Sequence, residues 1–387
     1  MATHFRRKTA GPVKSRERRR GPAVLRDDNM LAAGLLYDMA IVQSSERSRF
    51  GYSRAAKAIV GLPASVRELV ESGALKEVRF IGIATIRILT EFVAMGKSPT
   101  VEAAVAASSR RSDVEQRRLM RANFLSQHAM ERALGMPLPR TIVNGAAFRG
   151  DFQMHTTWSD GAETVATMVE ACLALGHTCM GVTDHSHGLP VARGMSMESA
   201  ARQLEEIDRA NEQYAGRFRV FKGIEANIRG DGSLDLDEGE RRAFEFVVAS
   251  PHALLRRKEN QSQRMLAAVR APGVAILGHP RGRVYNTRAG VVADWPRIFA
   301  AAAEREVAIE LDGNWHRQDL DWELASAALD AGCLFALDSD AHSIGELRFT
   351  DFAIAHARLA RIPSERVINC WSNERLMAWM EERRLSD

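Results

Sequence analysis

Residues 333–342 read "CLFALDSDAH", an apolar run that ends in two aspartates and a histidine. A short apolar run bounded by polar residues is typical of a strand that is buried on both faces. Asp340 and His342 stand just beyond the end of this predicted strand. The same combination of a buried strand and a polar end recurs along the chain, and its recurrence predicts the fold.

Five further runs follow this pattern. They are "CMGVTDH" (179–185), "RVFKGIEANI" (219–228), "FEFVVASPH" (244–252), "VAILGHP" (274–280) and "VAIELDGN" (307–314). Amphipathic stretches with helical spacing separate them. Alternating strands and helices predict an α/β domain built on a parallel sheet or barrel.

The polar residues at these strand ends are expected to meet. In a parallel barrel, the carboxyl ends of the strands surround one mouth, so residues far apart in the sequence lie together. Acids and imidazoles buried there would be unfavourable unless cations satisfied them. We therefore predict a metal cluster from the following residues: His155, Asp160, Asp184, His185, Glu225, His252, His279, Asp340 and His342.

The 387 residues are enough for two domains. Residues 1–28 form a basic tail, which we expect to be disordered. Residues 29–135 repeat apolar side chains three or four positions apart, which predicts an all-α domain. Residues 136–148 are a proline-bearing linker, and the α/β domain covers residues 149–387.

The tail is rich in arginine although the net charge of the whole chain is only +4. This asymmetry favours a polyanionic partner such as nucleic acid. A solvated tail without a partner explains the composition equally well.

The composition is that of a globular protein, with 45% hydrophobic and 26% charged residues. No apolar run is long enough to span a bilayer, and residues 1–20 lack the apolar core of a signal peptide. The four cysteines show no paired spacing. We expect a cytoplasmic protein with reduced thiols and no membrane partner.

The motifs, taken in order, resemble those of the PHP (polymerase and histidinol phosphatase) superfamily. They are "MHTTWSDG" (154–161), "VTDHS" (182–186), "GIEANI" (223–228), "ASPH" (249–252), "LGHP" (277–280) and "SDAHS" (339–343). The resemblance implies a distorted (β/α)7 barrel with two or three divalent metal ions, which the ligand types allow to be Zn, Mn or Fe.

Carried over position by position, the resemblance implies nine metal ligands: Gln153, His155, Asp160, His185, Glu225, His252, His279, Asp340 and His342. It implies that Glu225 bridges two ions. One of these would also be held by His155 and Asp340, and the other by His252 and His279. Asp160, His185 and His342 would hold a third ion.

Gln153 departs from the family pattern, because the first motif usually begins with a histidine there. An amide oxygen is a weaker ligand than an imidazole, so the first ion should bind less tightly. A hydrogen bond from Gln153 to a ligand is an equally good interpretation.

A cluster of divalent ions is suited to phosphoester hydrolysis, and phosphate also needs cationic contacts. We expect Arg281 and Arg283, which follow a ligand in "GHPRGR", to contact phosphate, with Arg193 in "PVARG" as a further candidate. Asp184 is expected to orient a ligand, transfer a proton to the leaving group or fix the turn. Asn314 is expected to line the mouth.

The helical part has a resemblance of its own. Residues 55–99 are similar to the helix-hairpin-helix region of family X DNA polymerases, whose bacterial members also carry a PHP domain. The chain thus looks like such a polymerase without its palm, because residues 99–150 are too few to hold one. The hairpin "RFIGIAT" keeps Gly82 but has Phe80 where glycine is usual, which weakens the expected phosphate contact. Lys76 and Arg79 lie beside it.

These observations predict an enzyme, namely a metal-dependent phosphoesterase acting on nucleic-acid ends as a 3′–5′ exonuclease, phosphodiesterase or 3′-phosphatase. The first alternative is a phosphatase of histidinol-phosphatase type that acts on small phosphomonoesters. The second is a non-catalytic factor that binds DNA or protein. Salt sensitivity of activity on oligonucleotides distinguishes the first two hypotheses.

Overall fold

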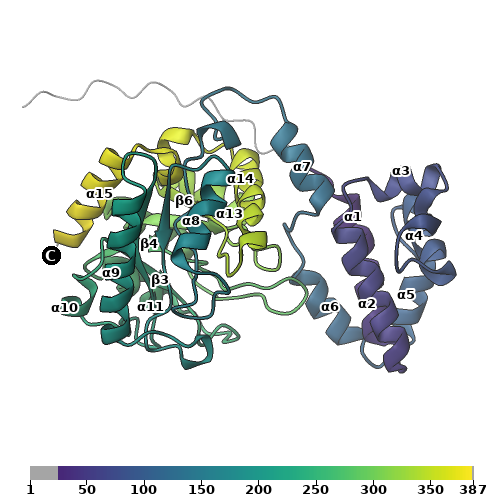
Figure 1. Ribbon diagram of the computed structural model, residues 1–387. Coiled ribbons are helices and arrows are strands. Elements are labelled where there is room, and N and C mark those ends of the chain that lie inside the picture. Colours follow the sequence, from purple (N-terminus) through teal and green to yellow (C-terminus); the bar gives the residue numbers. More distant parts are fainter. Residues whose placement is uncertain (1–24, 386–387) are drawn as a thin grey trace, which may run out of the picture.

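A computed structural model describes residues 25–385. It has a larger part around a parallel sheet and a smaller part made of helices (Figure 1). The predicted basic tail lies almost wholly outside the described residues. Within residues 25–385, no helix combines the length and the apolar character needed to cross a bilayer.

The smaller part begins with six helices that have a hydrophobic core of their own, in which Leu36, Ile88 and Phe92 are buried. Ser65 begins α3 with a capping box, in which its side chain and that of Glu68 each accept a backbone N–H bond. The elements are α1 (Asp28–Val42), α2 (Glu46–Val60), α3 (Val66–Glu71), the 3₁₀ helix η1 (Ala74–Glu77), α4 (Ile83–Met95), α5 (Pro99–Ala106) and α6 (Arg111–Leu119).

The larger part contains six parallel strands in the order β1-β2-β3-β4-β5-β6. This confirms the predicted α/β fold, since each strand lies in one of the predicted runs. The strands are β1 (Cys179–Val182), β2 (Arg219–Asn227), β3 (Phe246–Ser250), β4 (Val274–Leu277), β5 (Ala308–Asp312) and β6 (Leu334–Asp338).

Helices connect the strands and cover the sheet. They are α8 (Val165–Ala174), α9 (Met197–Gln213), α10 (Glu238–Arg241), α11 (Ser262–Arg270), α12 (Trp295–Glu304), α13 (Trp322–Ala331), α14 (Thr350–Leu359) and α15 (Asn373–Leu385). Short 3₁₀ helices complete this part: η2 (Gly145–Ala147), η3 (Pro190–Ala192), η4 (Ile344–Phe349), η5 (Ser364–Arg366) and η6 (Ile368–Cys370).

An irregular segment, residues 151–155, lies between β6 and β1 and takes the seventh position of the barrel. On one side its carbonyl oxygens at Asp151 and Met154 accept bonds from the amides of Gly181 and Thr183. On the other side the amide of His155 donates to the carbonyl oxygen of Ala341. The first predicted motif is thereby built into the sheet itself.

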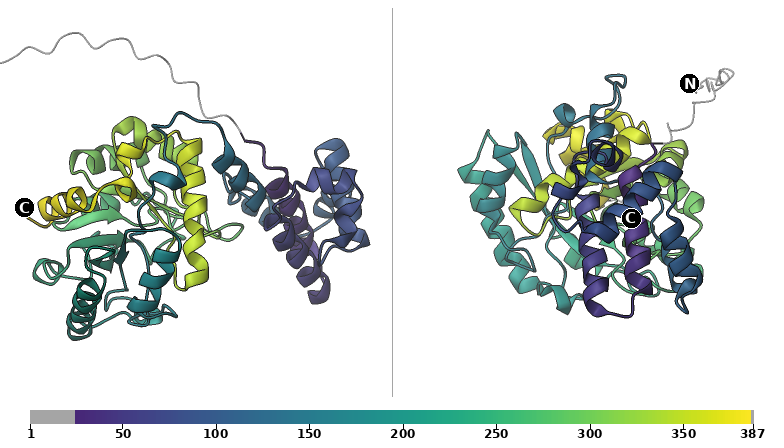
Figure 2. Two further views of the ribbon diagram at one scale, coloured as in Figure 1. Left: turned by 45° about the horizontal axis from the view of Figure 1, so that its top comes forward. Right: turned by 90° about the vertical axis from the view of Figure 1, so that its right-hand side faces the viewer.

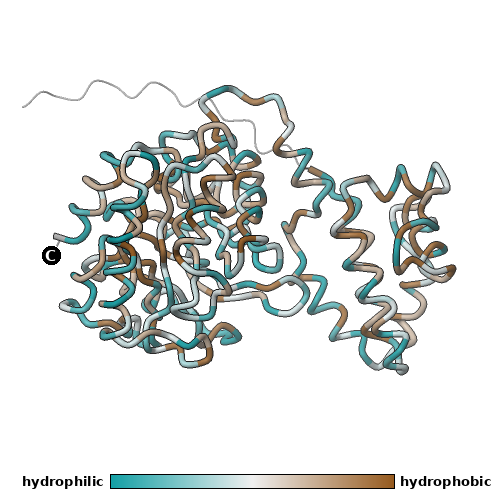
Figure 3. The backbone as a smooth tube through the Cα atoms, viewed as in Figure 1, coloured by the Kyte–Doolittle hydropathy of each residue, from teal (hydrophilic) through white to brown (hydrophobic). Residues whose placement is uncertain are grey.

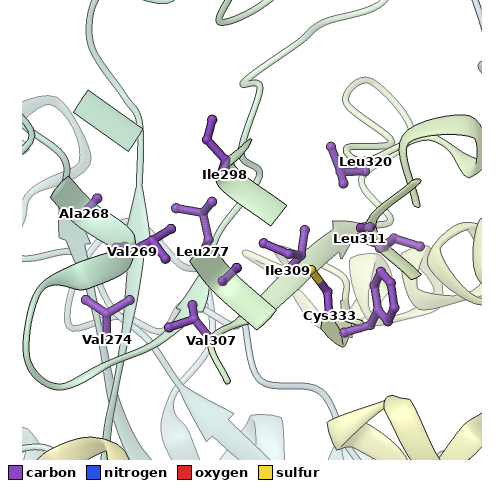
Figure 4. Packing of buried hydrophobic residues seen from close by; sticks show 14 of the residues in the cluster. Ala268, Val269, Val274, Leu277, Ile298, Val307, Ile309, Leu311, Leu320 and Cys333 are labelled. Carbon is purple, nitrogen blue, oxygen red and sulfur yellow. The ribbon is translucent and has the colours of Figure 1, made fainter. Parts of the chain in front are cut away.

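Apolar residues are concentrated along the strands at the centre of the larger part (Figure 3). Leu277, Ile309 and Leu311 from β4 and β5 gather with Val269 of α11 and Ile298 of α12 (Figure 4). Strands buried on both faces leave no side chain exposed within the sheet, so polar groups are directed to the strand ends. This arrangement positions the candidate site.

A hairpin, residues 280–291, reaches from the end of β4 to the helical part (Figures 1 and 2). The Arg117 Nη1 donates to the carbonyl oxygen of Asn286 at 2.8 Å, and the Arg121 Nε donates to its Oδ1 at 2.7 Å. In addition, α7 (Gln127–Gly135) packs its buried residues against those of α14. The two parts are therefore in direct contact through α6, the residues after it and α7.

Candidate metal centre

The predicted ligand positions come from seven segments around the carboxyl edge of the sheet. Gln153 and His155 lie in the segment that closes the barrel, and Glu225 lies in β2. The others lie in the first motif or follow strands: Asp160, His185, His252, His279, Asp340 and His342.

Four imidazoles surround the carboxylate of Glu225, which is completely buried. Its Oε2 lies 2.8 Å from His185 Nδ1 and 3.7 Å from His155 Nε2. Its Oε1 lies 3.0 Å from His279 Nε2 and 3.4 Å from His252 Nε2. The sequence-predicted bridging position is thus the centre of the constellation.

The imidazoles around Glu225 favour its ionised form. Burial opposes its ionisation, yet the imidazoles of His185 and His252 hold the pKa of this carboxyl well below its usual range. An ionised carboxylate with both oxygens directed at imidazole nitrogens has the donor arrangement of a bridging metal ligand.

A second group of possible ligand atoms lies beside the first. Those of His155, Asp160, His185 and His342 all lie within 4.8 Å of one another. The Oδ1 of Asp160 is 3.4 Å from His342 Nε2 and 3.6 Å from His185 Nε2. The side chains of Asp160 and His342 are each 30% exposed. This side of the cluster is therefore open to solvent and to a substrate.

Gln153 is completely buried, and neither Oε1 nor Nε2 of its amide has a hydrogen-bond partner. Moving an amide from water into an apolar interior without hydrogen-bond partners costs roughly 2–7 kcal/mol. A cation bound to Oε1 would satisfy one of these two unpaired atoms. The donor set, made of imidazole nitrogens, carboxylate oxygens and an orphaned amide oxygen, fits a divalent ion.

Two of the predicted ligands hold a backbone conformation that is rare for residues other than glycine. The φ angles are +23° at His279 and +53° at Asp340. Such residues persist only where the surrounding structure enforces them, and they concentrate at functional sites. Gly161 is required nearby, because a Cβ there would lie 2.4 Å from the carbonyl oxygen of His155.

Asp184 organises the loop that carries His155 and Asp160. Its buried carboxylate accepts bonds from the amides of Thr156 and Ser159, from their two hydroxyls, and from the side-chain amide of Gln203. These five hydrogen bonds occupy the carboxylate and tie it to the loop. The structure therefore corrects the expected proton transfer, and of the three predicted roles it favours fixing the turn.

The arginines expected to contact phosphate are bound elsewhere. The Arg283 side chain is 4% exposed and pairs with Asp321 at 3.0 Å. Its other donors reach the backbone carbonyls of residues 122, 123, 317 and 318, and it stacks on Phe124. Arg281 pairs with Asp321 at 3.1 Å. Arg283 is therefore held away from the metal centre and joins the larger part to residues 122–124, while a phosphate contact of Arg281 stays a prediction.

The remaining predicted substrate contacts lie on loops. Arg193 is exposed, with φ of +56°, at the end of η3. Asn314 is part of the turn after β5. Its backbone N–H donates to Asp312, and its side-chain Oδ1 accepts from the backbone N–H of His316. Asn314 shapes the turn that holds Arg317.

A buried acidic group beneath the centre was not singled out from the sequence. It comprises Asp151, Glu310, Asp312, Asp319 and Asp338, each at most 1% exposed. Burial and then the neighbouring Asp312 raise the pKa of Glu310 well above its usual range. The sequence did contain a signal for this group, because acids occur inside the apolar runs "VAIELDGN" and "LFALDSD". Arg317 joins this group, with Nη1 2.9 Å from Asp340 and 3.8 Å from Asp312, and no sequence pattern indicated it.

The helical hairpin exposes Lys76, Arg79 and Gly82. Gly82 begins α4, and Phe80 adopts φ of +70°, the conformation that glycine would hold in this hairpin. The side chain of Phe80 is held by Arg79, whose guanidinium lies 4.6 Å from the ring centroid. The phenylalanine thus adopts a positive φ although glycine is usual at this position.

The chain is similar to several curated proteins. It is 34% identical over 241 residues to the DNA polymerase/3′-5′ exonuclease PolX of Bacillus subtilis, a match covering 62% of this chain and 42% of that protein. It is 27% identical over 245 residues to the probable phosphatase YcdX of Escherichia coli K12, covering 60% of this chain and 94% of that protein.

Among solved structures, it matches histidinol phosphate phosphatase from Lactococcus lactis, with 17% identity and a TM-score of 0.39 over 54% of this chain and 93% of that one. No family model matches the chain. Between residues 99 and 150 the structure has helices and no regular strand, so this stretch holds no palm domain. The motifs, their convergence on Glu225 and the two curated relatives point the same way: the chain resembles PHP-superfamily proteins and, in the order of its parts, a bacterial family X DNA polymerase without the palm.

Proposed function

We propose that this protein is a metal-dependent phosphoesterase and that it acts on the ends of nucleic acids. The observation that carries the hydrolase proposal is the burial of Glu225 among four imidazoles, with Asp160 and His342 on the open side. Divalent ions bound at such a cluster supply an activated water and neutralise the oxygens of a phosphoester.

The chain's own residues keep the ligands in place for this chemistry. Asp184 fixes the loop of His155 and Asp160 through five hydrogen bonds. The amide of Asn227 donates to Asp235, and its Oδ1 lies 2.6 Å from His252 Nδ1, which orients that ring toward Glu225. Rigid support of this kind is what a preorganised site requires.

The nucleic-acid part of the proposal is supported by the match to PolX and by the hairpin at Gly82. No side chain caps the first turn of α4 at Gly82, and a helix N-terminus favours a phosphate. Lys76 and Arg79 lie on the same hairpin and are exposed. By contrast, Arg118 and Arg121 of the α6 region pair with the buried Asp38 and do not add to a free basic surface.

A second candidate is hydrolysis of small phosphomonoesters, favoured by the match that covers 94% of the probable phosphatase YcdX. Activity should be measured with added manganese or zinc on oligonucleotides labelled next to a 3′-hydroxyl or a 3′-phosphate, and on a small phosphomonoester. Release of nucleotide or phosphate that falls steeply as salt rises supports nucleic-acid ends. Turnover of only the small ester, indifferent to salt, supports the second candidate.

If wild-type protein is inert on every phosphoester, the proposal of an enzyme is wrong, and a binding factor remains as the third hypothesis. A cytoplasmic location stays a prediction.

A further inference from the structure

An open groove of about 920 Å³ lies beside the candidate metal centre and has no role in the site described above. Its walls are the loop that follows β3 and one residue of the hairpin at 280–291. Four cations and a single carboxylate line it: Arg256, Arg257, Lys258, Arg288 and Glu259.

His252 connects the groove with the metal centre. Its ring lines the groove, while its Nε2 lies 3.4 Å from Oε1 of Glu225. A molecule that is held at the centre and continues past His252 therefore enters the groove. A small phosphate ester that occupies only the centre would not need the cations of the groove.

Within the described chain, the cations of the groove form no ion pair, although Asp319 partly offsets the charge of Arg288. Among residues 25–385, no ion pair joins Arg256, Arg257, Lys258 or Arg288 to a carboxylate, although Arg256 donates to the carbonyl oxygen of Thr287 at 3.0 Å. Burial lowers the pKa of Arg288, and the nearby guanidiniums of Arg317 and Arg256 lower it further. Clustered like charges repel one another, and a polyanion along the groove would relieve that repulsion.

The loop that carries these cations is held in place from below. Arg264 is buried and donates through Nη1 to the carbonyl oxygen of Ala253 at 2.9 Å. The side chain of Gln261 donates to the carbonyl oxygen of Leu254 at 3.1 Å. A preformed loop reduces the entropy lost when a ligand binds.

Apolar surface accompanies the charge. Leu254 and Leu255 line the groove and are half-buried. A cationic groove with apolar contact surface is suited to a single strand, whose backbone follows the charge while its sugars and bases meet the apolar side chains. We propose that this groove binds the single-stranded part of a nucleic acid whose end occupies the metal centre; this rests on the proposed function and extends it.

The test compares two triple variants with the same change in charge. The groove variant is Arg256→Glu with Arg257→Glu and Lys258→Glu. The control variant is Arg270→Glu with Arg305→Glu and Arg366→Glu, three exposed residues at the opposite, amino-terminal edge of the sheet. Full-length proteins loaded with manganese are assayed on a single-stranded oligonucleotide and on bis-p-nitrophenyl phosphate, a small diester.

For the groove variant we expect KM for the oligonucleotide to rise by about tenfold or more, with kcat changed by less than about twofold. For this variant, the plot of log KM for the oligonucleotide against log salt concentration should become shallower. Its slope should fall by about 0.7 for each phosphate that the groove no longer neutralises. Kinetics on the small diester should change by less than about twofold, and the control variant should behave as wild type. Equal KM values for the oligonucleotide in the two variants would overturn the proposal.

Failure of the enzyme proposal is distinguishable from failure of the groove proposal. If wild type hydrolyses neither substrate, fluorescence anisotropy of a labelled oligonucleotide tests the groove alone. Weaker binding by the groove variant than by the control supports the groove. Equal binding by both, no binding by wild type, or equally tight binding of a duplex contradicts it.

Discussion

The Nη1 of Arg317 lies 2.9 Å from the Oδ2 of Asp340, a predicted metal ligand, and 3.8 Å from the Oδ2 of Asp312. One guanidinium therefore serves two buried carboxylates at the base of the candidate centre. Burial favours the neutral acid, but Arg317 and then His155 hold the pKa of Asp340 well below its usual range. Arg317 and an ion held by Asp340 would thus neutralise the same acidic group.

Arg317→Met should destabilise the metal-free protein more than the metal-loaded protein. Removing one partner of a buried pair leaves an uncompensated charge, which typically lowers the free energy of unfolding by about 3–5 kcal/mol. Urea unfolding with a chelator should show a loss of this order, and added manganese should restore part of it. Arg317→Lys, which keeps the charge, is the control and should lose less. Equal losses with and without metal would contradict the shared role.

Substitutions at Gln153 should change metal affinity in opposite directions. Gln153→His supplies an imidazole in place of an orphaned amide, so metal should be retained about tenfold more tightly, or about 1.4 kcal/mol. Gln153→Leu removes the donor and also removes two unsatisfied buried atoms, so it should bind metal more weakly while the metal-free protein becomes more stable. Competition against a chelator measures both affinities. Wild-type affinity in both variants would show that residue 153 does not contact an ion.

His252→Ala should abolish turnover while the helical part stays folded. The ring faces Glu225 and lies far from the core of α1 to α6. We expect the rate to fall by about a thousandfold or more, since the centre then lacks one of its ligands. Hydrogen exchange of the amides in α1 and α4 should match wild type. If the variant keeps its activity, His252 is not a ligand that turnover requires.

His356 should make folding stability depend on pH. It is buried, stacks on Trp322 and lies 2.8 Å from the Oε1 of Gln318, and burial lowers its pKa to about 3. The unfolded chain takes up a proton near pH 6.5, so between pH 6.5 and about 3 the unfolded state binds more protons. The contribution of His356 to the free energy of unfolding is therefore complete above about pH 6.5. It is lost as the pH falls through this window.

The slope from this residue is at most about 1.4 kcal/mol per pH unit. Urea unfolding at several pH values, with a chelator present, should show a shallower decline for His356→Gln than for wild type. Parallel curves would contradict the assignment.

The sequence predicts the strands, and the convergence of the polar residues that follow them, because both depend on local patterns. Each strand is a short apolar run, and the polar residues after it are directed to one edge by parallel pairing alone. His252 and His279 could thus be placed beside Glu225 without a structure.

Contacts set by long-range packing could not be predicted in this way. Arg283 follows a ligand in the sequence, yet it pairs with Asp321 and binds carbonyls near residue 122, because the helical part docks on that hairpin. Arg317 lies in a turn without regular pattern, and only the folded chain brings it to Asp340. The φ of +70° at Phe80 also has no signal in the residue type.

The most direct test of the shared centre is an anomalous difference map from crystals of the protein loaded with manganese, recorded on both sides of the metal absorption edge. We predict ions on both sides of the Glu225 carboxylate, contacted by His155 and Asp340 on one side and by His252 and His279 on the other. A map with no ion at Glu225, or with ions only at surface carboxylates elsewhere, would contradict the metal centre and with it the proposed hydrolase.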